Sequence, residues 1–200
     1  MYKAILFDFD GVLTTDKTGS QSVLSALAAL TSLPLDLLKR EYYPFNRRLL
    51  SGQTTHRAIW PEFERACGAS IDYELLLQAF RRTPLDQDML ALVGELHKTR
   101  LTGMVTDNKC DRIDGILDHH HLRGLFDVVS VSAQYGSGKD TPAIFEGTLA
   151  ALNVSPSECI FIDNSAKNLI VPERIGMHTI LFDDENRNIN NFRETLFRLL

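Results

Sequence analysis

The sequence predicts an α/β protein: a Rossmann-like parallel sheet of five main strands, with four helices inserted after the first strand. One observation is a set of five short apolar runs rich in β-branched and aromatic residues, at residues 3–9, 102–106, 127–131, 159–163 and 178–182. The other is a helical pattern between each of the last four runs. Strand–helix alternation of this kind is typical of parallel strands joined by helical crossovers on both faces of a sheet.

Each apolar run is expected to form a buried strand. Its apolar residues stand at consecutive positions, as in Ala4-Ile5-Leu6-Phe7, which is typical of a strand covered on both faces. Asp86 can cap the helix that follows the insert, and Gly176 can end the last crossover helix. The crossover helices are expected at about residues 86–98, 111–119, 142–152 and 166–175.

The segment between the first and second strands is strongly helical. Ser20 can cap its first helix, and Pro34 suits the first turn of the second. The third helix is expected to end at Gly68 and to be kinked or restarted at Pro61, because proline removes a helical hydrogen bond. A fourth covers about residues 71–82. The sequence therefore predicts one unit of residues 15–84 inserted into another of residues 1–14 and 85–200.

The composition narrows the class of partner. The chain is 44% hydrophobic and 24% charged, with a formal net charge of −5, which argues against a basic nucleic-acid-binding surface. No apolar run approaches the length of a membrane span, and the N-terminus lacks the features of a signal peptide. Cys67, Cys110 and Cys159 show no C-x-x-C spacing. We expect a cytoplasmic protein with reduced thiols and neither a nucleic-acid nor a membrane partner.

Polar residues follow four of the predicted strands. Ligands of parallel sheets collect beyond the carboxyl ends of the strands, so these residues are expected to share one site. They combine carboxylates, a hydroxyl, an ammonium group and an amide: Asp8 and Asp10, Thr106 and Asp107, Lys139, and Asp163 and Asn164. A single polar residue at a strand end commonly caps a turn, but four such positions point to chemistry at this edge.

The same residues carry a family resemblance. The stretches DFDGVLT, MVTDN, GSGKDTPAIFE and FIDNSAKNLIVPERIGM resemble, in order and spacing, the four motifs of the haloacid dehalogenase-like (HAD) hydrolase superfamily. The helical insert resembles the cap of the phosphatase subfamily whose cap follows the first motif. The resemblance spans the whole chain, and it implies a Rossmann-like core that hydrolyses phosphate esters through a phosphoaspartate with Mg²⁺.

The resemblance implies a role for each matching residue. Asp8 would be the nucleophile and a metal ligand, and Asp10 would act as general acid and then base while its backbone carbonyl binds the metal. Gly11 would let the backbone approach the phosphate. Phosphate contacts would also come from the residues of the second and third motifs, Thr106, Asp107 and Lys139. The remaining metal ligands would be Asp163 and Asn164.

Several positions depart from the family pattern, the Asp140-Thr141 pair that follows Lys139 among them. Asn164 stands where the second of two acids is usual, and its neutral carbonyl oxygen predicts weaker Mg²⁺ binding than a carboxylate. Asp163 either binds the metal or orients Lys139. Asp107 stands where asparagine is usual and adds negative charge near an anion, which argues against the usual phosphate contact.

Several functions share this set of motifs. The leading prediction is a Mg²⁺-dependent phosphatase of a small phosphorylated metabolite, as a monomer or weak dimer. A haloacid dehalogenase also uses an aspartate nucleophile, but typically lacks the second acid, so Asp10 counts against it. A phosphomutase resembling β-phosphoglucomutase shares the motifs and the cap placement. A non-catalytic binding protein on the same scaffold is the fourth possibility, and the set Asp8, Asp10 and Lys139 argues against it.

Charged residues of the insert are candidates for contact with the substrate. Arg47, Arg48 and His56 either face the site or form ordinary solvated surface. Trp60 and Phe63, three positions apart on a helix, are expected to pack the core of the insert itself.

Overall fold

Five parallel strands form the centre of the protein in the computed structural model, which describes residues 1–200. Their order is β3-β2-β1-β4-β5, so β1 lies in the middle. In the register, Leu6 of β1 stands opposite Gly103 of β2 and Phe161 of β4. The strands are β1 (Ala4–Phe7), β2 (Leu101–Thr106), β3 (Val128–Val131), β4 (Cys159–Asp163) and β5 (His178–Leu181). The predicted α/β class and parallel sheet are confirmed.

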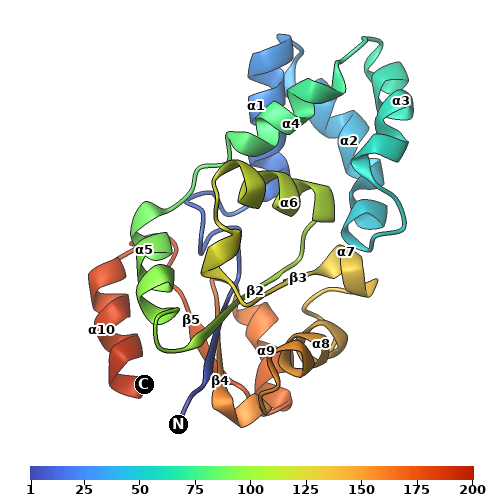
Figure 1. The fold of residues 1–200 in the computed structure, drawn as a ribbon. Helices are drawn as coiled ribbons and strands as arrows, with labels where there is room; N and C mark the ends of the chain where they lie inside the picture. The colour runs from blue at the N-terminus through green and yellow to red at the C-terminus, as the bar shows by residue number, and fades with distance from the viewer.

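Alternate residues of β1 reach the two helical layers. Ala4 and Leu6 belong to a core formed with α8 (Ala143–Leu152) and α9 (Ala166–Arg174). The intervening residues, Ile5 and Phe7, belong to a larger core on the other face. That face is covered by α5 (Gln87–Leu96), α6 (Cys110–His119) and α10 (Ile189–Leu199), as Figure 1 shows. Because both faces are covered, the strands read as consecutive apolar residues.

Four helices are inserted between β1 and α5, as the sequence predicts. They are α1 (Gly19–Thr31), α2 (Leu35–Leu50), α3 (His56–Cys67) and α4 (Tyr73–Arg81), and they stand beyond the carboxyl ends of the strands in Figure 1. Their two connections to the sheet run side by side, joined by an antiparallel bridge between Thr14 and Leu85. The carboxyl edge of the sheet is therefore overhung by the insert.

The third inserted helix does not restart at Pro61. It is continuous from its cap at Thr55 to Gly68, which ends it in the left-handed conformation. The indole of Trp60 is buried and donates a hydrogen bond to the carbonyl of Ile71, and Phe63 is fully buried beside it. This packing offsets the one helical hydrogen bond that proline removes.

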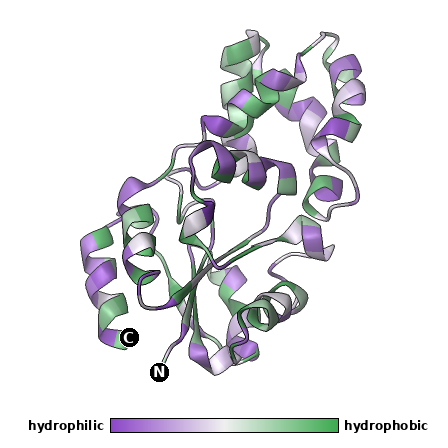
Figure 2. Ribbon diagram, viewed as in Figure 1, coloured by the Kyte–Doolittle hydropathy of each residue, from purple (hydrophilic) through white to green (hydrophobic).

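The remaining short elements connect the layers. α7 (Ser132–Tyr135) follows β3 directly, and two 3₁₀ turns span Arg123–Leu125 and Pro156–Glu158. In Figure 2 helices such as α10 carry hydrophilic and hydrophobic residues together, as expected of helices with one buried face. None of the helices combines the length and apolar character needed to cross a bilayer.

We expect Gly103→Ala to destabilise the protein by about 1–3 kcal/mol, because a Cβ there overpacks the centre of the sheet. That atom would lie 2.6 Å from a methyl group of Leu6 and 2.7 Å from one of Val128. Gly115→Ala in α6 is the control. Its Cβ meets nothing nearer than 3.7 Å, so it should stabilise the protein by about 0.5–1 kcal/mol. Urea unfolding measures both, and equal effects would contradict the packing described.

Candidate active site

A cavity of about 460 Å³ lies beyond the carboxyl ends of the strands. Its lining includes six of the eight predicted site residues: Asp8, Asp10, Thr106, Asp107, Lys139 and Asn164. The connection into α1 and the side chains of α2 close it from the other side, through Thr18, Gly19, Ser20, Tyr43, Asn46 and Leu50. Four motifs spread over the chain thus meet in one place, because the ends of parallel strands share one edge.

Lys139 links two carboxylates at the floor of the cavity. Its Nζ lies 2.8 Å from Oδ1 of Asp8 and 2.6 Å from Oδ2 of Asp163, and all three side chains are buried. Burial disfavours the charge of Lys139, but the two carboxylates outweigh it and raise its pKa. Burial, with the charge of Asp163, raises the pKa of Asp8 well above its usual range, against the opposing effect of Lys139. Two carboxylates sharing one ammonium leave an excess negative charge out of water.

Asp163 has no free hydrogen-bonding capacity toward the cavity. It is fully buried, and besides Lys139 it accepts hydrogen bonds from the backbone N–H of Ser165 and from the amide of Asn168. The carboxylate of Asp8 has Lys139 as its one polar partner, through Oδ1. Of the two acids, Asp8 is therefore the one with an oxygen available to a reacting group.

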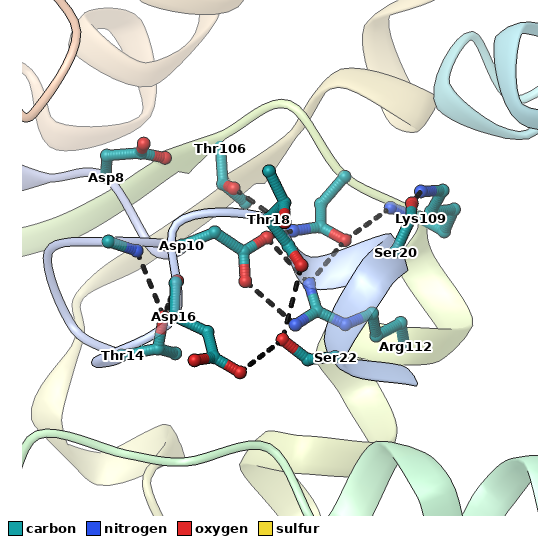
Figure 3. Close-up of polar contacts among 12 residues, drawn as sticks. Asp8, Asp10, Thr14, Asp16, Thr18, Ser20, Ser22, Thr106, Lys109 and Arg112 are labelled. Atoms are coloured by element: carbon teal, nitrogen blue, oxygen red, sulfur yellow. Dashed lines mark hydrogen bonds and ion pairs between the residues drawn. The ribbon is translucent and has the colours of Figure 1, made fainter. Parts of the chain in front are cut away.

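Asp10 points away from Asp8. Figure 3 shows its carboxylate turned toward Arg112 of α6, which donates two hydrogen bonds of 2.8 Å each. The amide of Asn108 donates a third, also of 2.8 Å. A bidentate arginine–carboxylate pair of this kind fixes the plane of the carboxylate. Gly19 is required beside it, because a Cβ there would overlap the guanidinium.

Gly11 shapes the turn within the first motif, although it does not line the cavity. Its φ of +87° lies in the left-handed region, and a Cβ would overlap the amide of Asn164. Its N–H donates to the hydroxyl of Thr14, and its carbonyl accepts from Arg187. Glycine is therefore needed here both for conformation and for the close approach of Asn164.

Asp107 makes a contact that its sequence position does not suggest. Its Oδ1 accepts a hydrogen bond of 2.9 Å from the backbone N–H of Lys139. Gly138 packs against the same carboxylate, and a Cβ there would lie 2.6 Å from it. Asp107 thereby anchors the loop that presents Lys139. Thr106 is buried, with its hydroxyl accepting a long hydrogen bond of 3.4 Å from Asn108.

Two cations near Asp10 were not predicted from the sequence. Lys109 is buried and donates to the hydroxyl of Ser20, and burial together with the charge of Arg112 lowers the pKa of Lys109 to about 7. Arg112 is also buried. The burial of Arg112 could have been predicted from the sequence, since it stands one turn before Ile116 on the apolar face of the predicted helix.

Of the charged residues of the insert that were candidates for substrate contact, one is buried away from the cavity and another lies beside it. His56 is fully buried and faces α6, with Nδ1 2.8 Å from Asp111 and Nε2 2.9 Å from the hydroxyl of Tyr42. It is therefore not a cavity residue. Arg47 lines a hollow of about 710 Å³ that adjoins the cavity and shares Tyr43, Asn46 and Leu50 of α2 with it.

The oxygen atoms near Asp8 fit a hard divalent cation. Oδ2 of Asp8, the carbonyl of Asp10 and Oδ1 of Asn164 accept no hydrogen bond from the protein, and carboxylate, carbonyl and amide oxygens are the ligands Mg²⁺ takes. No three His, Cys, Asp or Glu side chains converge as a metal site, so these three oxygens include only one carboxylate oxygen. The excess negative charge buried around Lys139 would favour a cation beside these oxygen atoms.

Sequence comparison agrees with this arrangement. The family model described as haloacid dehalogenase-like hydrolase matches residues 2–176. The chain belongs to the haloacid dehalogenase-like hydrolase family. It is 30% identical to bifunctional epoxide hydrolase 2 of Rattus norvegicus over 89% of this chain, and it spans only 36% of that protein's length. It is 25% identical to validoxylamine A 7'-phosphate phosphatase of Streptomyces hygroscopicus subsp. limoneus, over 90% of this chain and 85% of the relative.

Solved structures of HAD enzymes share the fold. One, from Bacteroides thetaiotaomicron in complex with magnesium and inorganic phosphate, has a TM-score of 0.77 at 15% identity and covers 96% of this chain and 100% of that one. A 2-haloacid dehalogenase from Pseudomonas syringae has a TM-score of 0.73 at 19% identity, with both chains covered completely. Likeness at these identities shows the fold alone.

We expect Asp8→Asn to stabilise the metal-free protein more at pH 8 than at pH 5. A carboxyl with a raised folded pKa stabilises the fold when protonated, and loses that contribution as pH rises from its ordinary pKa of 3.8 through the folded value. Asparagine stays neutral throughout. Urea unfolding in EDTA measures the difference, with the exposed Asp140→Asn as control. The same difference at both pH values would contradict the buried excess charge.

Proposed function

We propose that the protein is a Mg²⁺-dependent phosphatase of a small phosphorylated metabolite, acting through a phosphoaspartate on Asp8. The observation that carries the proposal is the pairing of Asp8, whose Oδ2 is free at the cavity floor, with the buried ammonium of Lys139. We further propose that residues 15–84 act as a cap over a catalytic core of residues 1–14 and 85–200.

In the first step Oδ2 of Asp8 attacks phosphorus, forming an acyl phosphate while the bond from phosphorus to the ester oxygen breaks. Lys139 and the hydroxyl of Thr106 face the phosphoryl oxygens, where an ammonium and a hydroxyl group stabilise developing charge. Asp10, in its protonated form, gives its proton to the departing oxygen. The alcohol leaves through the hollow lined by α2.

In the second step a water molecule attacks phosphorus, and Asp10 takes the proton of that water. The bond between phosphorus and Asp8 breaks, which regenerates the carboxylate and releases phosphate. Asp10 must turn from Arg112 toward Asp8 for both transfers, since the two carboxylates are directed apart in Figure 3. Arg112 and Asn108 thus define the resting position of the acid–base residue.

The metal would be held by Asp8, the backbone carbonyl of Asp10 and Asn164. Mg²⁺ supplies charge neutralisation, which lets an ionised carboxylate approach a phosphate dianion. We assign Asp163 the alternative role of orienting Lys139, because its hydrogen bonds to Lys139, Ser165 and Asn168 occupy both oxygens. The magnesium and inorganic phosphate bound to the Bacteroides enzyme of the same fold support a metal and a phosphate group as occupants of this cavity.

Asp10 favours a phosphatase over a dehalogenase. Displacing halide requires no proton donor, whereas an alkoxide leaving group does. The phosphatase name of the Streptomyces relative supports the same choice. A phosphomutase would use the same residues and would be revealed by phosphate transfer to a second hydroxyl of the substrate in place of water.

Wild-type protein should hydrolyse p-nitrophenyl phosphate with Mg²⁺, lose that activity in EDTA, and recover it when Mg²⁺ is added back. Asp8→Asn should abolish turnover, because an amide cannot form the acyl phosphate. Asp16→Asn, an exposed aspartate that lines neither the cavity nor the adjoining hollow, is the control and should retain activity. No turnover by the wild type across a panel of phosphorylated metabolites with Mg²⁺, Mn²⁺ and Co²⁺ would overturn the proposal.

Asp10→Asn should reduce kcat/KM by about 10²–10⁴-fold for an alkyl phosphate, and far less for p-nitrophenyl phosphate. The difference arises because p-nitrophenolate leaves without being protonated, and kcat/KM reports the step in which it leaves. Asp16→Asn, an exposed aspartate of the same loop, should change neither value. Equal losses on both substrates would contradict the role of Asp10 as the acid.

A further inference from the structure

The amide of Asn164 has a carboxylate partner of its own. Its Nδ2 donates a hydrogen bond of 2.7 Å to Oδ2 of Asp184. Asp184 lies in the loop between β5 and α10, twenty residues after Asn164, and its side chain is only 12% exposed. The negative charge that is missing at position 164 is therefore present one hydrogen bond away.

This contact fixes which way the amide points. An ionised carboxylate only accepts hydrogen bonds, so the group of Asn164 that faces Asp184 must be its NH₂. Oδ1 of Asn164 then faces away from Asp184, and no protein donor reaches it. An amide without such a partner can present either its nitrogen or its oxygen, and a nitrogen that carries two protons cannot bind a metal.

The loop is built to keep Asp184 in place. Lys17, from the connection into α1, lies 3.0 Å from Oδ1 of Asp184. The carboxylate of Asp183 accepts hydrogen bonds from the backbone N–H groups of Glu185 and Asn186, which holds the turn. At its end, Arg187 donates to the carbonyl of Gly11. The loop is thus fastened to the turn of the first motif.

We propose that Asp184 positions Asn164 as a metal ligand and supplies the negative charge that its amide lacks. A carboxylate behind a neutral ligand fixes the orientation of that ligand and increases the electron density on its oxygen. Asn164 and Asp184 together then take the place of the single acid that the family motif carries. This inference rests on the Mg²⁺ site of the proposed function.

Calorimetric titration with Mg²⁺ tests it without reference to turnover. Asp184→Asn keeps the size of the side chain but removes both its charge and its acceptor-only character, and should weaken Mg²⁺ binding about 10–100-fold. Glu185→Gln is the matched control: it removes the same charge from the neighbouring, exposed position, and Glu185 makes no contact with Asn164. It should change the Kd less than twofold, roughly the effect of a screened surface charge.

Exchanging the side chains at positions 164 and 184 should preserve Mg²⁺ binding, in contrast to Asp184→Asn alone. Asn164→Asp combined with Asp184→Asn places the carboxylate on the ligand position and keeps the hydrogen bond, so Mg²⁺ should bind at least as tightly as to the wild type. Asn164→Asp alone sets two carboxylates against each other, and should lower the Tm of the metal-free protein, whereas the exchange should not. The Tm of each metal-free variant also shows whether it is folded.

The outcomes separate this inference from the proposed function. Equal Kd values for Asp184→Asn and Glu185→Gln, or an exchanged variant that binds no more tightly than Asp184→Asn, would overturn the role of Asp184 and leave the phosphatase proposal standing. A wild-type protein that binds no Mg²⁺ would overturn both.

Discussion

The site depends on one buried lysine between two carboxylates. Lys139 contacts Asp8 and Asp163, and burying three charges is favourable only when they are mutually compensated. Here the compensation is incomplete, because one positive group faces two negative ones. One carboxylate charge is therefore left without a positive partner. Oδ2 of Asp8 faces the cavity with no hydrogen-bond donor, and other oxygen atoms nearby also accept no hydrogen bond from the protein. A site with this imbalance is suited to a cation and to a nucleophilic carboxylate.

The charged residues of the site stand at the ends of neighbouring strands or in the loops that follow them. β1 and β4 are neighbours in the sheet, so Asp8 and Asp163 end side by side, and the loop after β3 brings Lys139 between them. Asp107, at the end of β2, holds that loop by its backbone. The insert contributes from above through Ser20 and α2. The charged centre of the cavity and the wall that faces it therefore come from different parts of the chain.

The sequence predicts the architecture well, because consecutive apolar residues and their spacing determine which strands are buried. It also predicts which residues meet at the strand ends. The sequence does not predict contacts made by residues outside the motifs. Arg112 lies on the face of a helix, and Asp184 meets Asn164 only because the loop after β5 folds back toward it. The restart expected at Pro61 fails for a similar reason, since the packing of Trp60 and Phe63 overrides a local preference.

Trapping the covalent intermediate tests most directly whether Asp8 is the nucleophile. Enzyme turning over a phosphate ester with Mg²⁺ is quenched in acid and reduced with borohydride, which converts an aspartyl phosphate to homoserine, and the peptides are analysed by mass spectrometry. A nucleophilic Asp8 gives homoserine at position 8 and at no other aspartate, Asp10 and Asp163 included. Homoserine at another position, or full turnover with Asp8 never modified, would contradict it.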